Sequence, residues 1–159
     1  MKMSTSPWFT SAIATRGGDQ SGFQSSHLSD LVQGAPALIY SCSVREGGQT
    51  HGKTLGVLGV VFNWASLAEP ILKNLPLPAE EREHTECMIV DASGKILASH
   101  LGCENHATLH LPEFNRVLAE NKGFFIGNCQ GRNCCIAHAH APGFETYSTD
   151  WYSLIIQPC

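Results

Sequence analysis

The chain has 159 residues, of which 43% are hydrophobic and 15% are charged, and its formal net charge is −4 at pH 7. This length and composition are typical of one globular domain, predicted over residues 1–159, that buries about 70% of the surface its unfolded form exposes. The ten Lys and Arg residues stand singly along the chain. No basic stripe is available to neutralise a run of phosphates, which excludes nucleic acid as a partner.

The sequence shows neither a signal peptide nor a membrane-spanning segment. The stretch MKMSTSPWFTSAIATRGG has no apolar core of a signal peptide, and no window holds 18 consecutive apolar residues. We therefore expect no membrane span in this chain, and a cytoplasmic location or a soluble fragment of a membrane receptor. The seven cysteines are an odd number and include the terminal Cys159, which favours a reducing compartment.

The first predicted element is a short helix near the N-terminus. Pro7 suits the first helical position, and the helix is predicted over residues 8–16, with Trp8 and Ala12 on its apolar side. GGDQSG ends this helix, and the polar segment that follows is predicted to be a loop up to Pro36.

Two strands and a second helix follow. Residues 36–44 and 53–64 are rich in apolar and β-branched residues, and EGGQTHG between them is typical of a hairpin loop. The second strand contains two glycines in TLGVLGVVF, which indicates a bulge, tight packing or close approach by another group. From Ala65 the apolar residues recur at helical spacing, and the prolines at 76 and 78 end the helix.

The second half of the chain predicts mostly hairpins. CMIVDASGKILAS has two apolar arms around Asp-Ala-Ser-Gly, which is typical of a tight turn. A short charged helix or turn precedes it at residues 80–86, and a helix is predicted for 111–120. Further strands are predicted at residues 124–126, 134–140 and 147–156, the last of them central because both its faces are apolar. The predicted fold class is α+β, with a single antiparallel sheet of about five to six strands and helices packed on it.

Three stretches resemble the Cache-type and PAS-like sensor modules of bacterial chemoreceptors. PALIYSCSV followed by GKTLGVLGVVFNWASL looks like the late strands of a Cache module that run into a helix. CMIVDASGKILAS resembles the opening hairpin of a PAS-like module, and APGFETYSTDWYSLIIQ resembles the closing strand of such modules. Their order looks like the end of one module followed by a second, and PAS-like and GAF-like versions of the sheet both remain open.

The resemblance implies ligand sensing without catalysis and without a cofactor. Modules of this kind belong to chemotaxis receptors, histidine kinases or diguanylate cyclases, often between membrane helices. The implied partners are a small-molecule ligand and a signalling output domain or partner protein, and the chain is open to forming a homodimer. Because no output module follows Cys159, we expect a sensor fragment or a stand-alone homologue.

Three residues of the first half are predicted to bind the ligand. The resemblance places an aromatic residue like Trp8 beside the ligand at the start of a helix, although Trp8 is equally suited to the core. Arg16 has the planar guanidinium that pairs with a carboxylate, and Asp19 or Asp30 has a carboxylate for an amine. Tyr40 lies in mid-strand, where its hydroxyl either enters a pocket or binds a backbone carbonyl.

Three residues of the second half complete the predicted ligand site. Alternation along residues 134–140 places Cys134, Ile136, His138 and His140 on one face of the strand. His138 and His140 are therefore predicted to line the same cavity. Trp151 is a further candidate, although a core position suits it as well.

A metal- or redox-responsive protein is the alternative function. His138 and His140 form a His-x-His on one face, and Cys103 or His106 would complete a tetrahedral site for a transition metal such as zinc. No established zinc-binding spacing is present, however. The neighbouring Cys134 and Cys135 point to opposite faces of a strand, which disfavours a disulfide between them.

Overall fold

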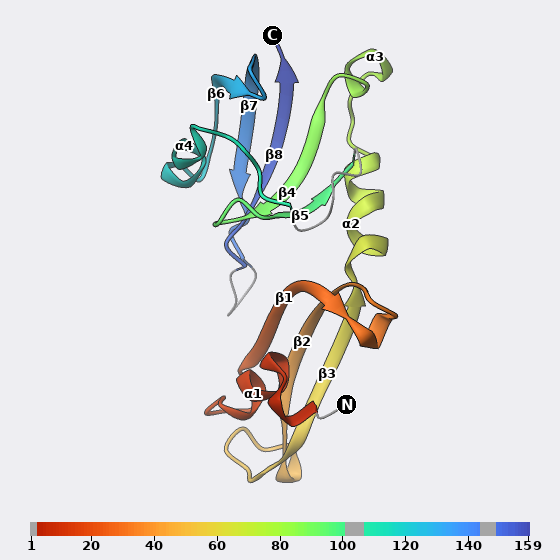
Figure 1. Ribbon diagram of the computed structural model, residues 1–159. Coiled ribbons are helices and arrows are strands. Elements are labelled where there is room, and N and C mark those ends of the chain that lie inside the picture. Colours follow the sequence, from red (N-terminus) through yellow and green to blue (C-terminus); the bar gives the residue numbers. More distant parts are fainter. Residues whose placement is uncertain (1–2, 101–106, 144–148) are drawn as a thin grey trace. The chain divides into compact units, whose positions relative to one another are not determined.

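A computed structural model describes residues 3–100, 107–143 and 149–159 (Figure 1). The chain divides after Leu67 into two compact units, the first built mainly from residues 1–67 and the second mainly from residues 68–159. Each unit has its own antiparallel sheet. The first sheet has the strand order β1 (Ser21–Ser29), β2 (Ala35–Arg45), β3 (Thr54–Asn63). The second has the order β5 (Ile96–Ser99), β4 (Glu86–Asp91), β8 (Trp151–Pro158), β7 (Arg132–His140), β6 (Lys122–Cys129).

The predicted α+β class with antiparallel strands is confirmed, but the strands form two sheets instead of one. Helix α2, Trp64–Lys73, lies between the two groups of strands in the sequence, and the last strand before it does not pair with the first strand after it. The division agrees with the order of the two module-like stretches in the sequence. A single sensor domain over residues 1–159 stays a prediction.

The first unit consists of a three-stranded sheet with one α-helix on it. Its elements are η1 (Met3–Thr5), α1 (Pro7–Ile13), β1 (Ser21–Ser29), η2 (Asp30–Val32), β2 (Ala35–Arg45), η3 (Glu46–Gly48) and β3 (Thr54–Asn63). The helix that Pro7 begins and the two apolar strands are confirmed. The loop predicted before Pro36 is wrong, because β1 forms there.

Strand β1 was not predicted from the sequence because most of its residues are polar. Its sequence SGFQSSHLS has no apolar alternation, and yet Gly22, Ser26 and Ser29 are buried. The pairing with β2 shifts between Gln24 and His27, which is a β-bulge that changes the direction of the side chains on either side of it. Pairing with the apolar strand β2 compensates for the low strand propensity of this segment.

Trp8 holds α1 against the sheet. Trp8 and Ala12, predicted on the apolar side of this helix, are both buried. The Ser41 hydroxyl of β2 donates a hydrogen bond of 2.7 Å to the Trp8 carbonyl. The Trp8 ring lies against Gly59 of β3, so closely that a Cβ at position 59 would stand 2.9 Å from Cζ3 of the ring. Tight packing therefore explains one of the two glycines in this strand.

The second unit has a five-stranded sheet and two further short helices. Its elements are α3 (Ala79–Arg82), β4 (Glu86–Asp91), β5 (Ile96–Ser99), α4 (Phe114–Ala119), β6 (Lys122–Cys129), β7 (Arg132–His140) and β8 (Trp151–Pro158). The central position predicted for the last strand is confirmed, because β8 pairs with both β4 and β7.

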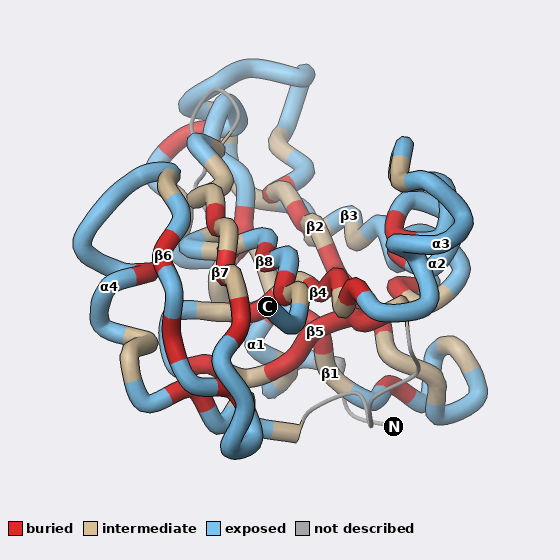
Figure 2. Tube along the Cα trace, turned by 90° about the horizontal axis from the view of Figure 1, so that it is seen from above, coloured by how far each residue is buried: buried red, intermediate tan, exposed pale blue. Residues whose placement is uncertain are grey.

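The core of the second unit lies on one face of its sheet. Ile136 and Val90 are completely buried and Leu154 is 1% exposed, and Figure 2 shows the buried positions recurring along these strands. The alternation predicted for β7 is confirmed, because Cys134, Ile136 and His138 are buried on one face. The hairpin predicted at residues 87–99 is confirmed as well, with Gly94 at a φ of +81° in its turn.

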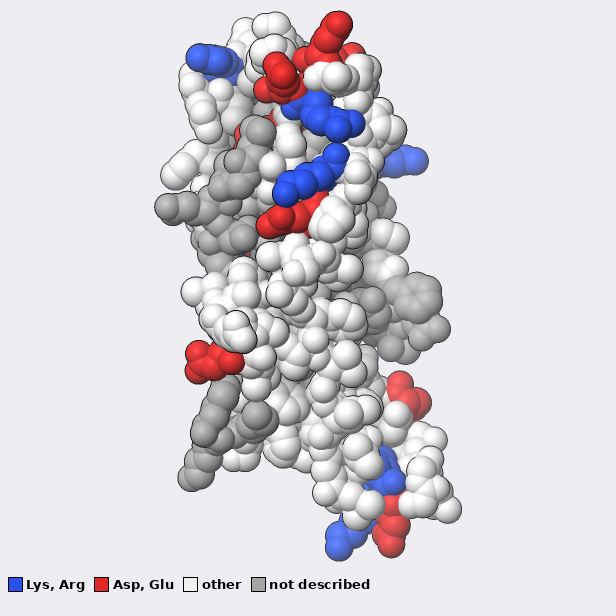
Figure 3. Space-filling model, turned by 90° about the vertical axis from the view of Figure 1, so that its right-hand side faces the viewer, with Lys and Arg blue, Asp and Glu red and all other residues white. Residues whose placement is uncertain are grey.

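Charged side chains are sparse on the surface. In Figure 3, Lys and Arg stand singly or beside Asp and Glu, and no basic stripe crosses this face. Lys73 and Glu69 on α2 form an ion pair, with their charged atoms 3.0 Å apart. Over the residues that the structure describes, no helix has both the length and the apolar character needed to cross a bilayer.

Replacement of Gly59 by Ala should destabilise the first unit, because the added methyl group meets the rigid, buried ring of Trp8. Overpacking of this kind lowers the free energy of unfolding by about 1–3 kcal/mol. Gly56→Ala on the same strand is the matched control, since a Cβ at position 56 has no heavy atom within 4 Å. Urea denaturation followed by tryptophan fluorescence measures both variants, and equal stabilities would contradict the packing described.

Candidate functional site

A cavity of about 200 Å³ in the first unit is the candidate ligand site, and we name it the Trp8 cavity. It lies where the start of α1 meets β1, η2 and β2. Its lining residues are Ser6, Pro7, Trp8, Gln24, His27, Leu28, Ser29, Asp30, Leu31 and Ile39.

Local hydrogen bonds hold the α1 side of the cavity. The backbone N–H groups of Phe9 and Thr10 both donate to the Ser6 carbonyl, at 3.0 Å each, and so begin the helix. The Trp8 backbone N–H donates to Oε1 of Gln24 on β1 at 3.3 Å. The helix start and the first strand are thus connected at the cavity itself.

A tight turn presents Asp30 at the other side of the cavity. The Ser29 hydroxyl accepts a hydrogen bond from the Leu31 N–H, and the Gly34 N–H donates to the Ser29 carbonyl at 2.9 Å. Gln33 and Gly34 both have positive φ, at 58° and 80°, which reverses the chain into β2. Asp30 is exposed and is the only Asp, Glu, Lys or Arg among the described residues that line the cavity.

His27 contributes a polar ring with a defined tautomer. Its Nδ1 is 2.9 Å from the Ser25 carbonyl oxygen, which only accepts hydrogen bonds, so Nδ1 carries the proton. In the neutral ring Nε2 is then an acceptor. The β-bulge lies immediately before His27 and contributes to the placement of this side chain.

The structure separates the other two predicted residues of the first unit from this cavity. Arg16 is exposed after α1, where its backbone N–H donates to the Gln20 side chain at 2.8 Å. Tyr40 lies on the opposite face of the sheet from Ser41 and α1, with its ring 5.0 Å from that of Phe23 and 5.8 Å from that of Phe62. Ligand binding by Arg16 and Tyr40 stays a prediction.

The predicted residues of the second unit lie at two places. His138 is 6% exposed and points into the core, where its ring centroid is 6.1 Å from that of Phe125. The His140 ring is 4.7 Å from that of Tyr152, and its Nε2 is 3.8 Å from an oxygen of Asp150. His140 and Trp151 both line a mainly apolar cavity of about 310 Å³, formed by Ile89, Ala139, His140, Ala141, Pro142, Trp151, Tyr152 and Ser153.

The predicted metal site is not assembled in the part of the chain that the structure covers. Among the described residues, no group of three or more His, Cys, Asp and Glu is arranged to hold a metal ion. Cys103 and His106 lie outside the described residues, so the tetrahedral site stays a prediction. No Cys pair forms a disulfide among the six described cysteines.

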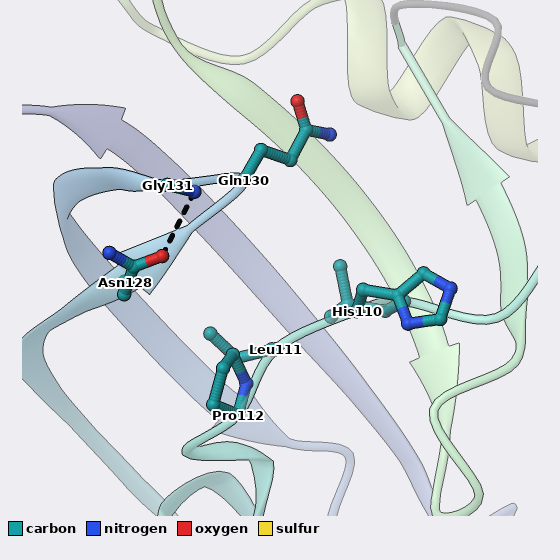
Figure 4. A pocket seen from close by; sticks show the side chains of 7 residues that line it. His110, Leu111, Pro112, Asn128, Gln130 and Gly131 are labelled. Carbon is teal, nitrogen blue, oxygen red and sulfur yellow. Dashed lines mark hydrogen bonds between the residues drawn. The ribbon is translucent and has the colours of Figure 1, made fainter.

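A further hollow of about 430 Å³ contains none of the predicted residues. It lies between the segment before α4 and the turn that joins β6 to β7 (Figure 4). His110, Asn128 and Gln130 give it polar walls, and the Asn128 side chain accepts a hydrogen bond from the Gly131 N–H.

Comparison with solved structures identifies the fold. The ligand-binding domain of the Campylobacter jejuni chemoreceptor Tlp3 in complex with 4-methylisoleucine is similar to this chain at a TM-score of 0.70 and 17% identity, over 99% of this chain and 54% of that one. The ligand-binding domain of the Pseudomonas aeruginosa amino acid chemoreceptor PctC, in complex with GABA, gives a TM-score of 0.70 at 19% identity, over 99% of this chain and 63% of that one. The fold is that of a chemoreceptor ligand-binding domain.

A third similar structure shows the same fold at lower similarity. The ligand-binding domain of Pseudomonas fluorescens CtaA in complex with L-alanine has a TM-score of 0.62 and 14% identity, over 98% of this chain and 60% of that one. The chain spans 54% of the length of the Tlp3 domain and 60% of the length of the CtaA domain. No protein-family model matches the chain, and no curated protein matches it in sequence.

Sequence reasoning missed Gln24 and His27 as lining residues of the Trp8 cavity. Both lie on β1, which was predicted to be a loop. A period-two search over SGFQSSHLS finds no apolar face there, so only the pairing with β2 reveals these side chains. Asp30 was already a candidate partner for an amine.

The buried thiols should react slowly with alkylating reagents. Burial, together with nearby acidic groups, raises the pKa of the Cys87 and Cys129 thiols, so at neutral pH their thiolate fraction is below that of an exposed cysteine. We expect iodoacetamide to label them roughly tenfold or more slower than the exposed Cys159.

Peptide mass spectrometry of the native protein measures the three rates side by side. Because the pKa of Cys129 is raised, its labelling should continue to accelerate as the pH rises well above neutrality. Equal rates at the three cysteines would show that the thiols are not buried as described.

Proposed function

We propose that this chain is the small-molecule-sensing part of a bacterial chemotaxis-type receptor, and that its ligand binds in the Trp8 cavity. The observation that carries the proposal is the meeting of an aromatic ring and a single carboxylate, Trp8 and Asp30, around one cavity of the sensory fold. The volume of about 200 Å³ suits a ligand of a few non-hydrogen atoms.

The ligand proposed for this cavity carries a protonated amine. Asp30 supplies the one formal charge among the described lining residues, and it is negative. A carboxylate and a tryptophan face both attract an ammonium group. The 4-methylisoleucine, L-alanine and GABA bound to the similar domains all contain an amine, which supports small amino acids as the ligand class.

Signalling in this proposal is a shift between two arrangements of the first unit. The helix start, the first strand and the η2 turn all contact the cavity, so an occupant ties them together. The ligand shifts the equilibrium between the two arrangements only as far as its affinity for one exceeds its affinity for the other. Helix α2 continues directly from β3 and is the proposed path to the rest of the protein.

The proposed activity is binding and not catalysis, and it requires no cofactor. An output domain or partner protein receives the signal, either as part of a longer receptor chain or from outside it. In this proposal the chain acts as a soluble sensory part of such a receptor. A homodimer remains compatible with this arrangement.

Replacement of Asp30 by Asn should weaken binding of the amine-containing ligand by about 10- to 100-fold, because a charge-assisted hydrogen bond becomes a neutral one. Isothermal titration with L-alanine, GABA and a panel of small amino acids measures the loss. Asp19→Asn is the matched control, since Asp19 is an exposed aspartate that does not line the cavity.

The two variants should have the same thermal stability without ligand, because both aspartates are exposed. The wild-type melting temperature should rise with ligand concentration. Binding that both variants retain, or both lose equally, would rule out Asp30 as the amine partner.

A further inference from the structure

Two buried cysteines at one end of the five-stranded sheet line a cavity of about 290 Å³. Cys129 at the end of β6 is 7% exposed and Cys134 on β7 is 4% exposed. Both belong to the core cluster of the second unit. The other lining residues are Glu83, His84, Glu86, Gln130, Arg132, Ile156 and Pro158.

The hairpin register sets the distance between the two thiols. Cys129 pairs with Arg132 and Gly127 pairs with Cys134, so the two cysteines are diagonal neighbours on the same face. Diagonal neighbours have Cα atoms about 7–8 Å apart and Cβ atoms somewhat closer, whereas a disulfide needs Cβ atoms about 3.5–4.5 Å apart. Two metal–sulfur bonds of about 2.3 Å place the sulfurs up to about 4.6 Å apart, which this spacing accommodates.

We propose that Cys129 and Cys134 bind one soft monovalent cation of the Cu(I) type between their sulfur atoms. Thiolates select soft metals such as Cu(I). A linear two-sulfur site needs no third protein ligand, which agrees with the absence of any three-donor group among the described residues.

The reaction balances without an oxidant. Two S–H bonds break, two S–Cu(I) bonds form, and two protons leave to water, while copper and sulfur keep their oxidation states.

The charges around the cavity suit both the free cation and the complex. Glu83 and Glu86 in its lining carry negative charge, which attracts a cation. The bound unit of two thiolates and one Cu(I) carries a net charge of −1, and the Arg132 guanidinium lies in the same lining to offset it. This site belongs to the second unit and does not depend on the proposed sensing function of the Trp8 cavity.

The test is a titration of the reduced full chain with Cu(I) in competition with a chromogenic Cu(I) chelator, without oxygen. We expect each protein chain to take one Cu(I) ion from the chelator. The affinity should rise by about 100-fold per pH unit near neutrality, because two protons are displaced for each metal ion. A slope below about tenfold per pH unit, or no competition at all, would overturn the proposal.

Three alanine variants identify the sulfur ligands. Cys129→Ala and Cys134→Ala should each weaken Cu(I) binding by at least about 100-fold. Cys135→Ala is the matched control, because Cys135 is next in sequence to Cys134 but lies on the other face of β7. Equal weakening by Cys135→Ala would overturn the proposal.

A circular dichroism melt of each metal-free variant monitors folding. The two ligand variants test the same site independently, and the wild-type pH slope needs no variant. Asp30→Asn should leave Cu(I) binding unchanged, so failure of this site and failure of the Trp8 cavity give different results.

Discussion

The contact between the Trp8 ring and Gly59 is the constraint on which the first unit depends. A helix of only seven residues has little stability of its own, so α1 needs tertiary contacts to form. The ring on the glycine and the Ser41 hydrogen bond supply them from two different strands. The Trp8 cavity exists because this helix start is held beside β1 and the η2 turn.

The two units use their polar residues in different ways. In the first unit, small polar side chains such as Ser41 and Gln24 connect backbone segments and border a cavity that holds one carboxylate. In the second unit, His138 and two thiols are enclosed with apolar residues on the core face of the sheet. The proposed amine-containing ligand depends on the first arrangement, and the proposed Cu(I) site depends on the second.

Local patterns predicted most elements but not their assembly. The apolar alternation of β7 and the Asp-Ala-Ser-Gly turn before β5 are properties of neighbouring residues, and both were predictable. The split into two sheets depends on which strands pair over long distances, and hairpin signals carry no such information. Strand β1 forms through its pairing with β2, so its polar sequence gave no signal.

The candidate sites show the same limit. Trp8 and Asp30 were candidates from the sequence and both line the Trp8 cavity, although ligand binding by them stays a prediction. Gln24 and His27 lie on a strand that the sequence did not reveal. The relation between Cys129 and Cys134 depends on the two-residue turn at Gln130 and Gly131, which have φ values of 52° and 82° and fix the register. The adjacent pair Cys134 and Cys135 is more conspicuous in the sequence, but its side chains lie on opposite faces.

Backbone amide NMR during titration with a small amino acid tests the central claim most directly, because it locates the ligand without a variant. The account predicts saturable shifts at Trp8, Gln24 and Asp30, with the resonances of β6 and β7 unchanged. Shifts confined to the second unit, or none at saturating amino acid across the panel, would contradict it.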